Sequence, residues 1–302
     1  MGRAVAEHVL IVKYGVVIVT YHSFERIIRY VREELPKMGD DLVAVIVDND
    51  ADVGSSRRLA DACGAVFVPD AEAEVPRDAR LFLLNFKENL GYGRGNNRGA
   101  SFLSRNFRVR YLLFSNDDIE VESPDILAEL CRPMLQDRQI KVTGPQIVGL
   151  DGAQQSPHWK PISLYREIGW SLLGFLRKKR KNTSVVPTLH AGICYWVSGA
   201  FMLAETDAFL DAGQFDEKVF LYNEEKILSE RLARRGWKCC WQPAGKVLHY
   251  EGASTQPSVD KRRLLLASSC HYYRHYRGYS AAAVWIYRIS CRLGRWLKWR
   301  NS

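Results

Sequence analysis

Residues 111–122 read YLLFSNDDIEVE, an apolar run that breaks into the polar residues Ser115, Asn116, Asp117 and Asp118. A short apolar run that ends in polar side chains is typical of a buried strand in a parallel sheet. In open α/β sheets, ligands bind beyond the carboxyl ends of the strands. The pattern therefore predicts that these polar residues lie at an edge of the sheet where a ligand would bind.

The two adjacent carboxylates, Asp117 and Asp118, allow two interpretations. They repel each other unless a cation lies between them or one of them is protonated. Hard divalent cations prefer such oxygen ligands and bridge them to phosphates. A structural role is equally compatible with this stretch, because Asn116 and Asp117 favour a turn and Asp118 can cap a helix. Other segments of the chain are needed to decide between a metal site and a turn.

Two earlier segments repeat the pattern of an apolar strand followed by polar residues. Residues 16–20 (VVIVT) precede Tyr21, and residues 42–47 (LVAVIV) precede Asp48. The alternation of such strands with amphipathic helices predicts an α/β, doubly wound and mostly parallel sheet, in which right-handed crossovers bring Asp48 and Asp118 to one cleft. The other predicted elements of this half are two helices and a short strand, at 23–37, 55–63 and 65–68.

Residues 89–99 (NLGYGRGNNRG) are rich in glycine and asparagine, and we expect a loop that leads into a helix at 100–107. The glycine spacing superficially matches a dinucleotide-binding turn, which would indicate a nicotinamide- or flavin-dependent oxidoreductase. Such a turn directly follows the first strand, whereas this segment comes after two strand–helix units. A backbone that approaches a phosphate and a plain glycine-rich loop are equally compatible with the segment itself.

The second half of the chain continues the alternation of strands and helices. Residues 156–184 interrupt it with aromatic residues and five consecutive basic residues, and we interpret them as a loop or excursion near the cleft. A solvated basic loop is the favoured explanation for them, and contact with a phosphate or a lipid headgroup is the functional alternative. The other predicted elements are helices at 124–135, 205–212 and from 223 to just before 236, and strands at 142–149, 195–204, 238–242 and 246–250.

The charge is concentrated at the C-terminus. Net charge is +9, but residues 261–302 carry ten Lys or Arg and no acidic residue, which leaves 33 basic and 34 acidic groups in the rest. From residue 281 a helix is predicted with one apolar, tryptophan-containing arc beside a basic arc, as in helices that lie in a membrane interface. Residues 271–279 (HYYRHYRGY) add aromatic belt residues. Nucleic-acid binding is a less favoured alternative, because the apolar arc is wide, and an ordinary packed helix is a serious competitor.

Seven scattered cysteines, without a CxxC pair, indicate reduced and mostly buried thiols of a cytosolic protein. The sequence contains no visible signal peptide and no uninterrupted apolar run long enough to cross a bilayer. Together with the basic tail, these features predict a cytoplasmic protein that is peripheral at the inner face of the cell membrane.

Taken together, seven segments resemble inverting glycosyltransferases of family 2, especially the bacterial rhamnosyltransferase-like branch that elongates surface polysaccharides. Each segment is a weak signal alone, but their occurrence in this order is specific. The matching segments are VVIVTYHS (16–23), VIVDND (45–50), ENLGYGRGNNRG (88–99), LLFSNDD (112–118), SGAFML (198–203), GQFDEKVFLYNEEKILSERLARRGW (213–237) and VLHYEGAS (247–254).

The resemblance implies a GT-A fold over residues 1–256, with residues 257–302 as a helical tail. It implies that Asp48 contacts the nucleotide base, that Asp118 and His249 hold a divalent cation (Mg²⁺ or Mn²⁺), and that Glu225 is the catalytic base beside Glu224. The chain departs from the commonest pattern at Asn116, which cannot carry charge, and at Glu225, where many relatives have Asp. The donor-binding set implied is Thr20, Tyr21, Asp48, Asn89, Gly91, Asn97, Asn116, Asp117, Ser198 and Gly199.

The residue types suit the chemistry that the resemblance implies. A cation neutralises the charge that develops on a leaving diphosphate, and a carboxylate takes the proton of the acceptor hydroxyl. Helix-dipole complementarity alone would also place Glu224 and Glu225 in a first helical turn. The implied donor is a dTDP- or UDP-sugar and the implied acceptor a glycan, with a lipid-linked one favoured and no nucleic acid expected. An oxidoreductase and a non-catalytic relative that only binds nucleotide-sugars are the alternatives.

Overall fold

The computed structural model describes residues 10–69, 75–173, 190–250 and 259–300. Within these ranges, eleven strands form one sheet. The strands are β1 (Leu10–Thr20), β2 (Leu42–Asp48), β3 (Val66–Val68), β4 (Leu81–Asn85), β5 (Phe107–Asn116), β6 (Ile119–Val121), β7 (Ile140–Gly149), β8 (Gln154–Ser156), β9 (Gly192–Cys194), β10 (Phe201–Glu205) and β11 (Lys238–His249).

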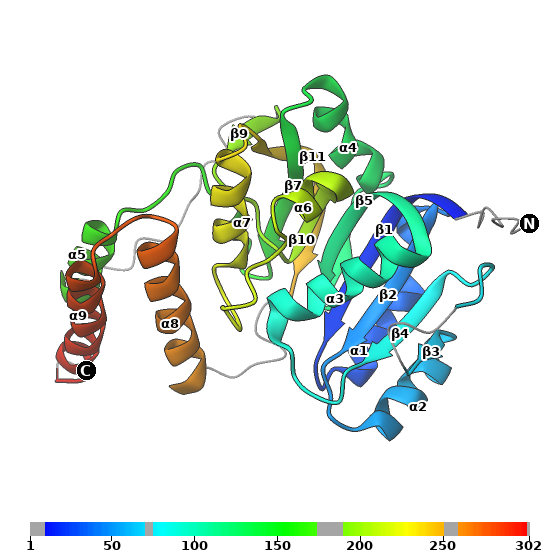
Figure 1. Cartoon of the computed structure of the whole chain (residues 1–302), viewed down its shortest axis with the longest axis horizontal. Coiled ribbons are helices and arrows are strands. Elements are labelled where there is room, and N and C mark those ends of the chain that lie inside the picture. The colour runs from blue at the N-terminus through cyan, green and yellow to red at the C-terminus, as the bar shows by residue number, and fades with distance from the viewer. Residues whose placement is uncertain (1–9, 70–74, 174–189, 251–258, 301–302) are drawn as a thin grey trace, which may run out of the picture.

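The helices surround this sheet and extend beyond one side of it (Figure 1). The first helix continues into a π-helical turn, η1 (Tyr30–Glu34), and a 3-10 turn, η2 (Leu35–Met38). The helices are α1 (Phe24–Arg29), α2 (Val53–Cys63), α3 (Gly91–Asn106), α4 (Ile126–Gln136), α5 (Leu164–Leu173), α6 (Thr206–Asp211), α7 (Glu224–Ala233), α8 (Val259–His275) and α9 (Ala281–Arg300).

The sheet is mixed but mostly parallel, which confirms the predicted α/β class. Its strands follow the order β3-β4-β2-β1-β5-β10-β7-β11-β6, with β8 paired to β7 and β9 to β11. The five strands from β3 to β5 are parallel, as are β7 and β11, whereas β10 runs antiparallel to both of its neighbours and β6 runs antiparallel to β11. The parallel run therefore brings the carboxyl ends of β1, β2, β4 and β5 to one edge.

Alternate residues of the central strands pack into two separate cores, one on each face. Val16 and Ile18 of β1 face a core that includes Ile27 of α1 and residues of η1, α2 and α4. Val17 faces the opposite core, which includes Phe102 of α3 and Leu228 of α7 together with residues of α6. Because both faces are buried, the strands read as continuous apolar runs rather than as alternating ones.

The expected glycine-rich loop at 89–99 is wrong, because helix α3 begins at Gly91. Its glycines lie against the sheet: a Cβ at Gly99 would lie 2.4 Å from Val17 Cγ1, and one at Gly95 would lie 3.1 Å from Val19 Cγ2. Glycine is a poor helix former, but here the missing side chains let α3 approach β1 closely. Tertiary packing thus outweighs local propensity, and the segment does not form a dinucleotide-binding turn.

Three strand predictions also differ from the structure. Strand β4 was not predicted, and the expected strand at 195–204 is shorter in the structure, because residues 195–200 lie outside the named strands and β10 begins at Phe201. The two expected strands at 238–242 and 246–250 form the single strand β11, whose register shifts between Gln242 and Lys246. The sequence QPAGK at this shift contains a proline and a glycine, which explains why the strand reads as broken.

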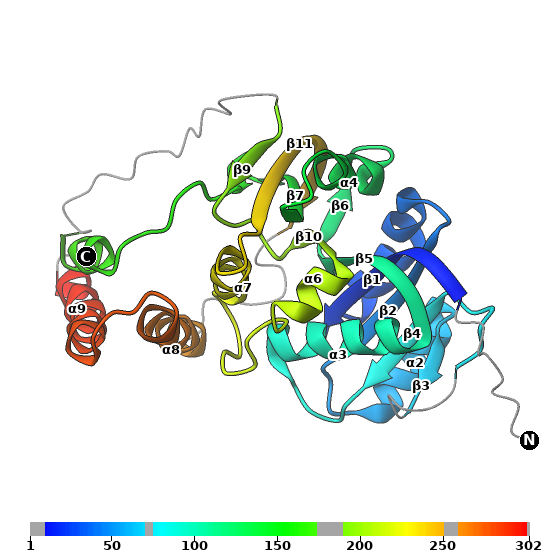
Figure 2. The ribbon, with the colours of Figure 1, turned by 45° about the horizontal axis from the view of Figure 1, so that its top comes forward.

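Helices α8 and α9 lie with α5 at one side of the sheet (Figures 1 and 2). A third core joins α5, α8 and α9 to the loop before α7 and to α7 itself, through Leu164, Tyr273, Tyr287, Val219 and Ile227. The predicted helix from residue 281 is confirmed, and the excursion at 156–184 contains α5. The basic run at 177–181 lies outside the described residues.

Part of the expected aromatic belt is packed inside the protein. Tyr272 and Tyr273 are buried in the third core and are therefore not available to a membrane surface. The outer side of α9 keeps its exposed apolar residues, which include Trp285 and Trp296. In the described part of the chain, none of the helices combines the length and the hydropathy needed to cross a bilayer.

Candidate active site

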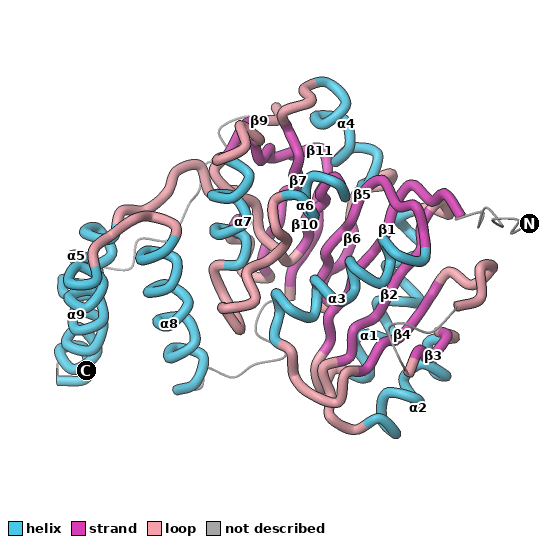
Figure 3. The backbone as a smooth tube through the Cα atoms, in the orientation of Figure 1, coloured by secondary structure: helices cyan, strands magenta, loops and turns pink. Residues whose placement is uncertain are grey.

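The polar residues that follow the parallel strands lie side by side. Thr20 pairs with Asp48 and Asp48 pairs with Asn85, while Val19, one residue before the end of β1, pairs with Asn116. The loops after these strands gather at the same end of the sheet (Figure 3). The structure therefore brings together the strand-end residues that the sequence singled out.

Asp118 and His249 are brought together by the antiparallel pairing of β6 and β11. Ile119, which follows Asp118, pairs with His249, and His249 Nε2 lies 3.1 Å from Asp118 Oδ1. The other ring nitrogen, Nδ1, lies 2.6 Å from Gln155 Oε1. Because an amide oxygen can only accept, Nδ1 carries a proton in this contact and Nε2 is directed at Asp118.

Asp118 is a buried carboxylate that remains ionised. Burial alone raises the pKa of Asp118, but the hydrogen bond and charge of His249, together with the charge of Arg26, lower it overall below its ordinary value. A carboxylate oxygen beside an imidazole nitrogen fits a divalent cation such as Mn²⁺ or Mg²⁺. No group of three or more His, Cys, Asp or Glu side chains placed to hold a metal occurs in the part of the chain that the structure describes.

Asp117 points to the first strand rather than to His249. Thr20 Oγ1 donates to Asp117 Oδ2 at 2.7 Å, and Arg26 Nε of α1 lies 3.5 Å from Asp117 Oδ1. Burial raises the pKa of Asp117, and the contacts with Thr20 and Arg26 oppose that rise. Asn116 lies beside the histidine instead, with its Nδ2 3.4 Å from His249 Nε2.

Asp48 is held at the end of β2 by a small polar network. Ser56 Oγ of α2 donates to Asp48 Oδ2 at 2.6 Å, and the backbone N of Asp50 donates to Asp48 Oδ1 at 3.1 Å. Asn85 Nδ2 donates to Ser56 Oγ at 2.7 Å. Burial raises the pKa of Asp48, and the hydrogen bonds from Ser56 and from the backbone N of Asp50 oppose this rise. By contrast, the side chain of Tyr21, just after β1, is exposed to solvent.

Glu225 lies against the backbone of Gly199. The backbone N of Gly199 donates to Glu225 Oε1 at 3.0 Å, and Tyr92 OH of α3 donates to the carbonyl oxygen of the same glycine at 2.7 Å. A side chain there would displace these groups, since a Cβ at position 199 would lie 2.5 Å from Tyr92 OH and 2.7 Å from Glu225 Oε1. Burial raises the pKa of Glu225, while the hydrogen bond from Gly199 and the charge of Lys226 oppose the rise.

Glu224 is the more deeply buried member of the acidic pair. Its side chain lies beside α3, where a Cβ at Gly93 would lie 3.4 Å from Glu224 Cγ. Its Oε1 is buried without a hydrogen-bond partner in the described structure. Burial, with the charge of Glu225, raises the pKa of Glu224 to about 8. Glu224 therefore holds a proton at neutral pH, whereas Glu225 is the carboxylate with a defined donor.

The acidic pair and the Asp118–His249 pair are connected through one short segment. The backbone N of Asn116 donates to the carbonyl oxygen of Ala200 at 2.9 Å, and Ala200 directly follows Gly199. Pairing of Phe201 with Ser115 fixes this arrangement in the sheet. Residues 198–200 thus contact Glu225 on one side and the segment that bears Asp118 on the other.

The remaining predicted donor-binding residues have clear local roles. Asn89 Oδ1 accepts from Gly91 N at 2.9 Å, and Ser198 N donates to Ser156 Oγ at 3.3 Å. Asn97 exchanges two hydrogen bonds with the backbone of Phe215, at 3.0 and 3.1 Å. The amide of Asn97 is therefore engaged in holding the loop before α7.

Sequence reasoning missed three residues that shape the site, namely Gln155, Tyr92 and Arg26. Gln155 lies just before the excursion, where nothing in the pattern connects it to a histidine almost a hundred residues away. Tyr92 stands inside the glycine-rich segment, and an aromatic residue among glycines was the available signal. Arg26 reads as an ordinary exposed residue on the first helix.

Comparison with known proteins assigns the family. Residues 13–264 match the family described as glycosyltransferase like family 2. The chain belongs to this family. Its members carry out glycosyl transfer, so the chain is a glycosyltransferase of glycan biosynthesis, and the oxidoreductase alternative is wrong.

Two curated relatives extend this assignment. The chain is 27% identical over 250 residues to an N-acetylglucosaminyl-diphospho-decaprenol L-rhamnosyltransferase of Mycobacterium tuberculosis, covering 76% of this chain and 80% of that protein. It is 22% identical over 164 residues to the rhamnosyltransferase WbbL of Escherichia coli, covering 53% and 61% of the two chains. Both relatives support the rhamnosyltransferase-like resemblance.

A solved structure supports the fold. The crystal structure of GalNAc-T7 with UDP, GalNAc and Mn²⁺ matches with a TM-score of 0.56 at 16% identity, over 90% of this chain. The match covers 49% of that protein, so the chain spans about half of its length. At this identity the likeness establishes the GT-A type fold.

Proposed function

We propose that this glycosyltransferase moves a sugar from a nucleotide-sugar to a glycan acceptor with inversion at the anomeric carbon, with Glu225 as general base and a divalent cation at Asp118 and His249. One observation carries the proposal. Residues 198–200 join the Glu225 carboxylate to the segment that bears Asp118, so a base and an anion-neutralising centre flank the same strand end.

The proposed reaction is a single displacement. The acceptor oxygen forms a bond to the anomeric carbon while the bond from that carbon to the diphosphate oxygen breaks, and the proton of the acceptor hydroxyl passes to Glu225. The raised pKa of Glu225 makes its carboxylate a stronger base than an exposed glutamate. The hydrogen bond from Gly199 N holds one carboxylate oxygen, which leaves the other to face the acceptor.

Asp118 and His249 would hold the cation. When bound, it would neutralise the charge that develops on the leaving diphosphate. The fit rests on a buried carboxylate, on an imidazole nitrogen 3.1 Å from it, and on Gln155, which contacts the other nitrogen of the ring. Asp48 and Thr20 would contact the nucleotide from the ends of their strands, and Asp117 would support the ribose or the cation.

The acceptor is proposed to be a lipid-linked glycan. The Mycobacterium relative is named for a diphospho-decaprenol acceptor and for transfer of L-rhamnose, which supports an acceptor of this class and dTDP-rhamnose or a UDP-sugar as donor. A lipid-linked acceptor would place the enzyme at a membrane surface, on the cytoplasmic side where nucleotide-sugars are available.

The outer side of α9 suits that surface. Trp285, Ile286, Leu293 and Trp296 are exposed on α9, next to the exposed Arg288 and Arg292. The opposite side of α9 packs on α5 so closely that a Cβ at Gly294 would lie 1.8 Å from the backbone O of Ser171. Exposed tryptophans beside arginines match the interface of an anionic bilayer. Residues 257–302 would thus form the membrane-contacting appendage of a catalytic domain at 1–256.

Calorimetric titration with a panel of dTDP- and UDP-sugars, with and without Mn²⁺, tests the function. The proposal expects one sugar nucleotide to bind and to bind more tightly with Mn²⁺. Turnover of that donor with a lipid-linked acceptor separates the enzyme from a non-catalytic relative. Absence of binding for every sugar nucleotide would contradict the proposal.

For the membrane contact, the Trp285→Ser and Trp296→Ser double variant should lose co-sedimentation with anionic vesicles and keep donor binding.

A further inference from the structure

The segment that leads into α7 has an uncommon backbone. Tyr222 and Asn223 both lie in the left-handed region, with φ of 73° and 70°. Non-glycine residues seldom adopt this conformation, and it persists only where the surroundings enforce it. Because α7 begins at the next residue, with Glu224 and Glu225 in its first turn, the contacts that hold this bend also set the position of both carboxylates.

One side of the bend is held by α3. The backbone N of Tyr92 donates to the carbonyl oxygen of Phe220 at 3.1 Å. Gly91, with φ of 75°, allows this approach, because a Cβ there would lie 2.2 Å from the same oxygen. This support comes from the glycine-rich segment, inside the region that matches the family.

The other side of the bend is held by α8. Ser268 Oγ donates to the carbonyl oxygen of Leu221 at 2.7 Å, and Asn223 Nδ2 donates to Ser269 Oγ at 3.1 Å. Ser268, Ser269 and Asn223 are all buried. We call Ser268 and Ser269, with their contacts to residues 221–223, the serine clasp.

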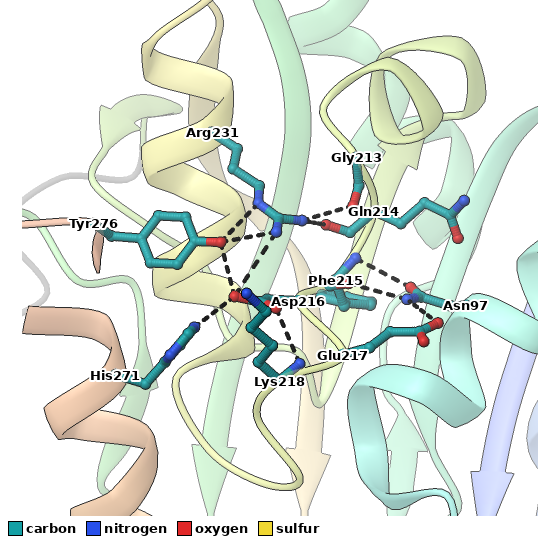
Figure 4. Close-up of polar contacts among 10 residues, drawn as sticks. All are labelled: Asn97, Gly213, Gln214, Phe215, Asp216, Glu217, Lys218, Arg231, His271 and Tyr276. Atoms are coloured by element: carbon teal, nitrogen blue, oxygen red, sulfur yellow. Dashed lines mark hydrogen bonds and ion pairs between the residues drawn. The ribbon is translucent and has the colours of Figure 1, made fainter. Parts of the chain in front are cut away.

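Helix α8 is itself anchored to the loop before α7 at Asp216 (Figure 4). Asp216 Oδ2 accepts from His271 Nε2 at 2.7 Å and from Tyr276 OH at 2.8 Å, and Arg231 Nη2 of α7 lies 3.8 Å away. Burial raises the pKa of Asp216, but the hydrogen bonds from Lys218 N, His271 and Tyr276 lower it overall. An ionised, buried carboxylate with this many donors fixes α8 against α7.

The match to the family ends at residue 264, so the clasp and His271 lie beyond it. We propose that Ser268 and Ser269 are positioning residues for the transfer reaction, which hold residues 221–223 so that the Glu225 carboxylate stays against Gly199. This inference rests on the proposed role of Glu225 as base. Helix α8 then supports the active site from beyond the region that matches the family, whether or not α9 also contacts a membrane.

Single Ser268→Ala and Ser269→Ala variants of the full chain test the clasp, with Ser290→Ala as a matched control. Ser290 is also buried, and its Oγ donates to the Tyr287 carbonyl oxygen at 2.8 Å, a bond of the same kind within α9. The clasp variants should lower kcat by about 10- to 100-fold with donor KM unchanged, because a small misplacement of a catalytic group costs rate and not donor binding. Ser290→Ala should leave kcat unchanged.

Hydrogen–deuterium exchange gives a readout that needs no turnover. Amides of residues 220–226 should exchange faster in the clasp variants than in Ser290→Ala, with the rest of the sheet unchanged. Exchange and kcat that match Ser290→Ala would overturn the clasp. A wild-type protein without any transfer activity would instead count against the proposed function, and the exchange comparison would still decide whether the clasp holds the bend.

Discussion

Glu225 and Gly199 are joined by a hydrogen bond of 3.0 Å from the glycine backbone N to the glutamate Oε1. The contact holds the first turn of α7 against the segment before β10. Its geometry depends on the absence of a side chain at position 199, because a Cβ would meet both Glu225 Oε1 and Tyr92 OH. The proposed base is therefore oriented by backbone.

Gly199→Ala should displace the Glu225 carboxylate. A Cβ 2.7 Å from Oε1 forces one of the two groups to move, and we expect transfer to fall by about 10- to 100-fold. Donor affinity should be retained. Steady-state kinetics and donor titration measure both effects. Gly169→Ala is the control, since a Cβ there meets nothing within 4 Å, and equal rates for the two variants would contradict the assignment.

Stability should fall as the pH rises toward the pKa of Glu224. Burial raises this pKa from 4.5 to about 8, so between these values the folded state binds more protons than the unfolded chain. The stabilisation is complete below the unfolded pKa and is lost as pH rises through the folded one. Each pKa unit corresponds to about 1.4 kcal/mol, so we expect a decrease of the order of a few kcal/mol between about pH 5 and pH 8.5.

Glu224→Gln should reduce this pH dependence, because the buried group can no longer ionise. Urea unfolding at a series of pH values measures the free energy of unfolding directly. The exposed Glu33→Gln provides the control and should keep the wild-type slope. An unchanged slope in Glu224→Gln would show that another group is responsible.

Asp118→Asn and His249→Ala should each abolish the enhancement of donor binding by Mn²⁺. The two side chains lie 3.1 Å apart and are the proposed ligands, so the loss of either removes a direct metal contact. Calorimetry with the donor that binds wild type, with and without Mn²⁺, provides the measurement. The exposed Asp211→Asn should behave as wild type. Undiminished enhancement in the Asp118 and His249 variants would place the cation elsewhere.

Asn97→Ala should lower stability and leave donor affinity unchanged. Both hydrogen bonds of the Asn97 amide to Phe215 are buried, and leaving such backbone groups unpaired costs about 1–3 kcal/mol. Unfolding in urea and donor titration separate the two effects. Weaker donor binding at unchanged stability would contradict this prediction and support the donor-binding role that the sequence resemblance implies for Asn97.

The sequence predicted the parts of the fold that depend on local pattern. The apolar runs at residues 16–20, 42–47 and 111–114 became β1, β2 and β5, because strands buried on both faces need continuous apolar side chains. The polar strand ends then fell at one edge through the parallel topology. The pairing of Asp118 with His249 agreed with the resemblance, but it depends on the register of β6 and β11, which no local pattern encodes.

The missed features depend on contacts between distant segments. Helix α3 forms in a glycine-rich segment because Gly95 and Gly99 pack on Val19 and Val17. The absence of side chains is favourable only once the sheet has formed and the helix can pack closely on it. The serine clasp could not be predicted from the sequence for a similar reason. Ser268 and Ser269 look like ordinary helix residues until α8 lies beside the bend before α7. Periodicity identifies the face of a helix but not the partner of that face.

The role of Glu225 as general base is tested most directly by Glu225→Gln, with the exposed Glu33→Gln as control. The amide keeps the size of the side chain but cannot accept the acceptor proton, so the rate of sugar transfer should fall by ~10²–10⁴-fold. Donor affinity with Mn²⁺ should match wild type in the same preparation. Transfer by Glu225→Gln at a rate near wild type would contradict the account.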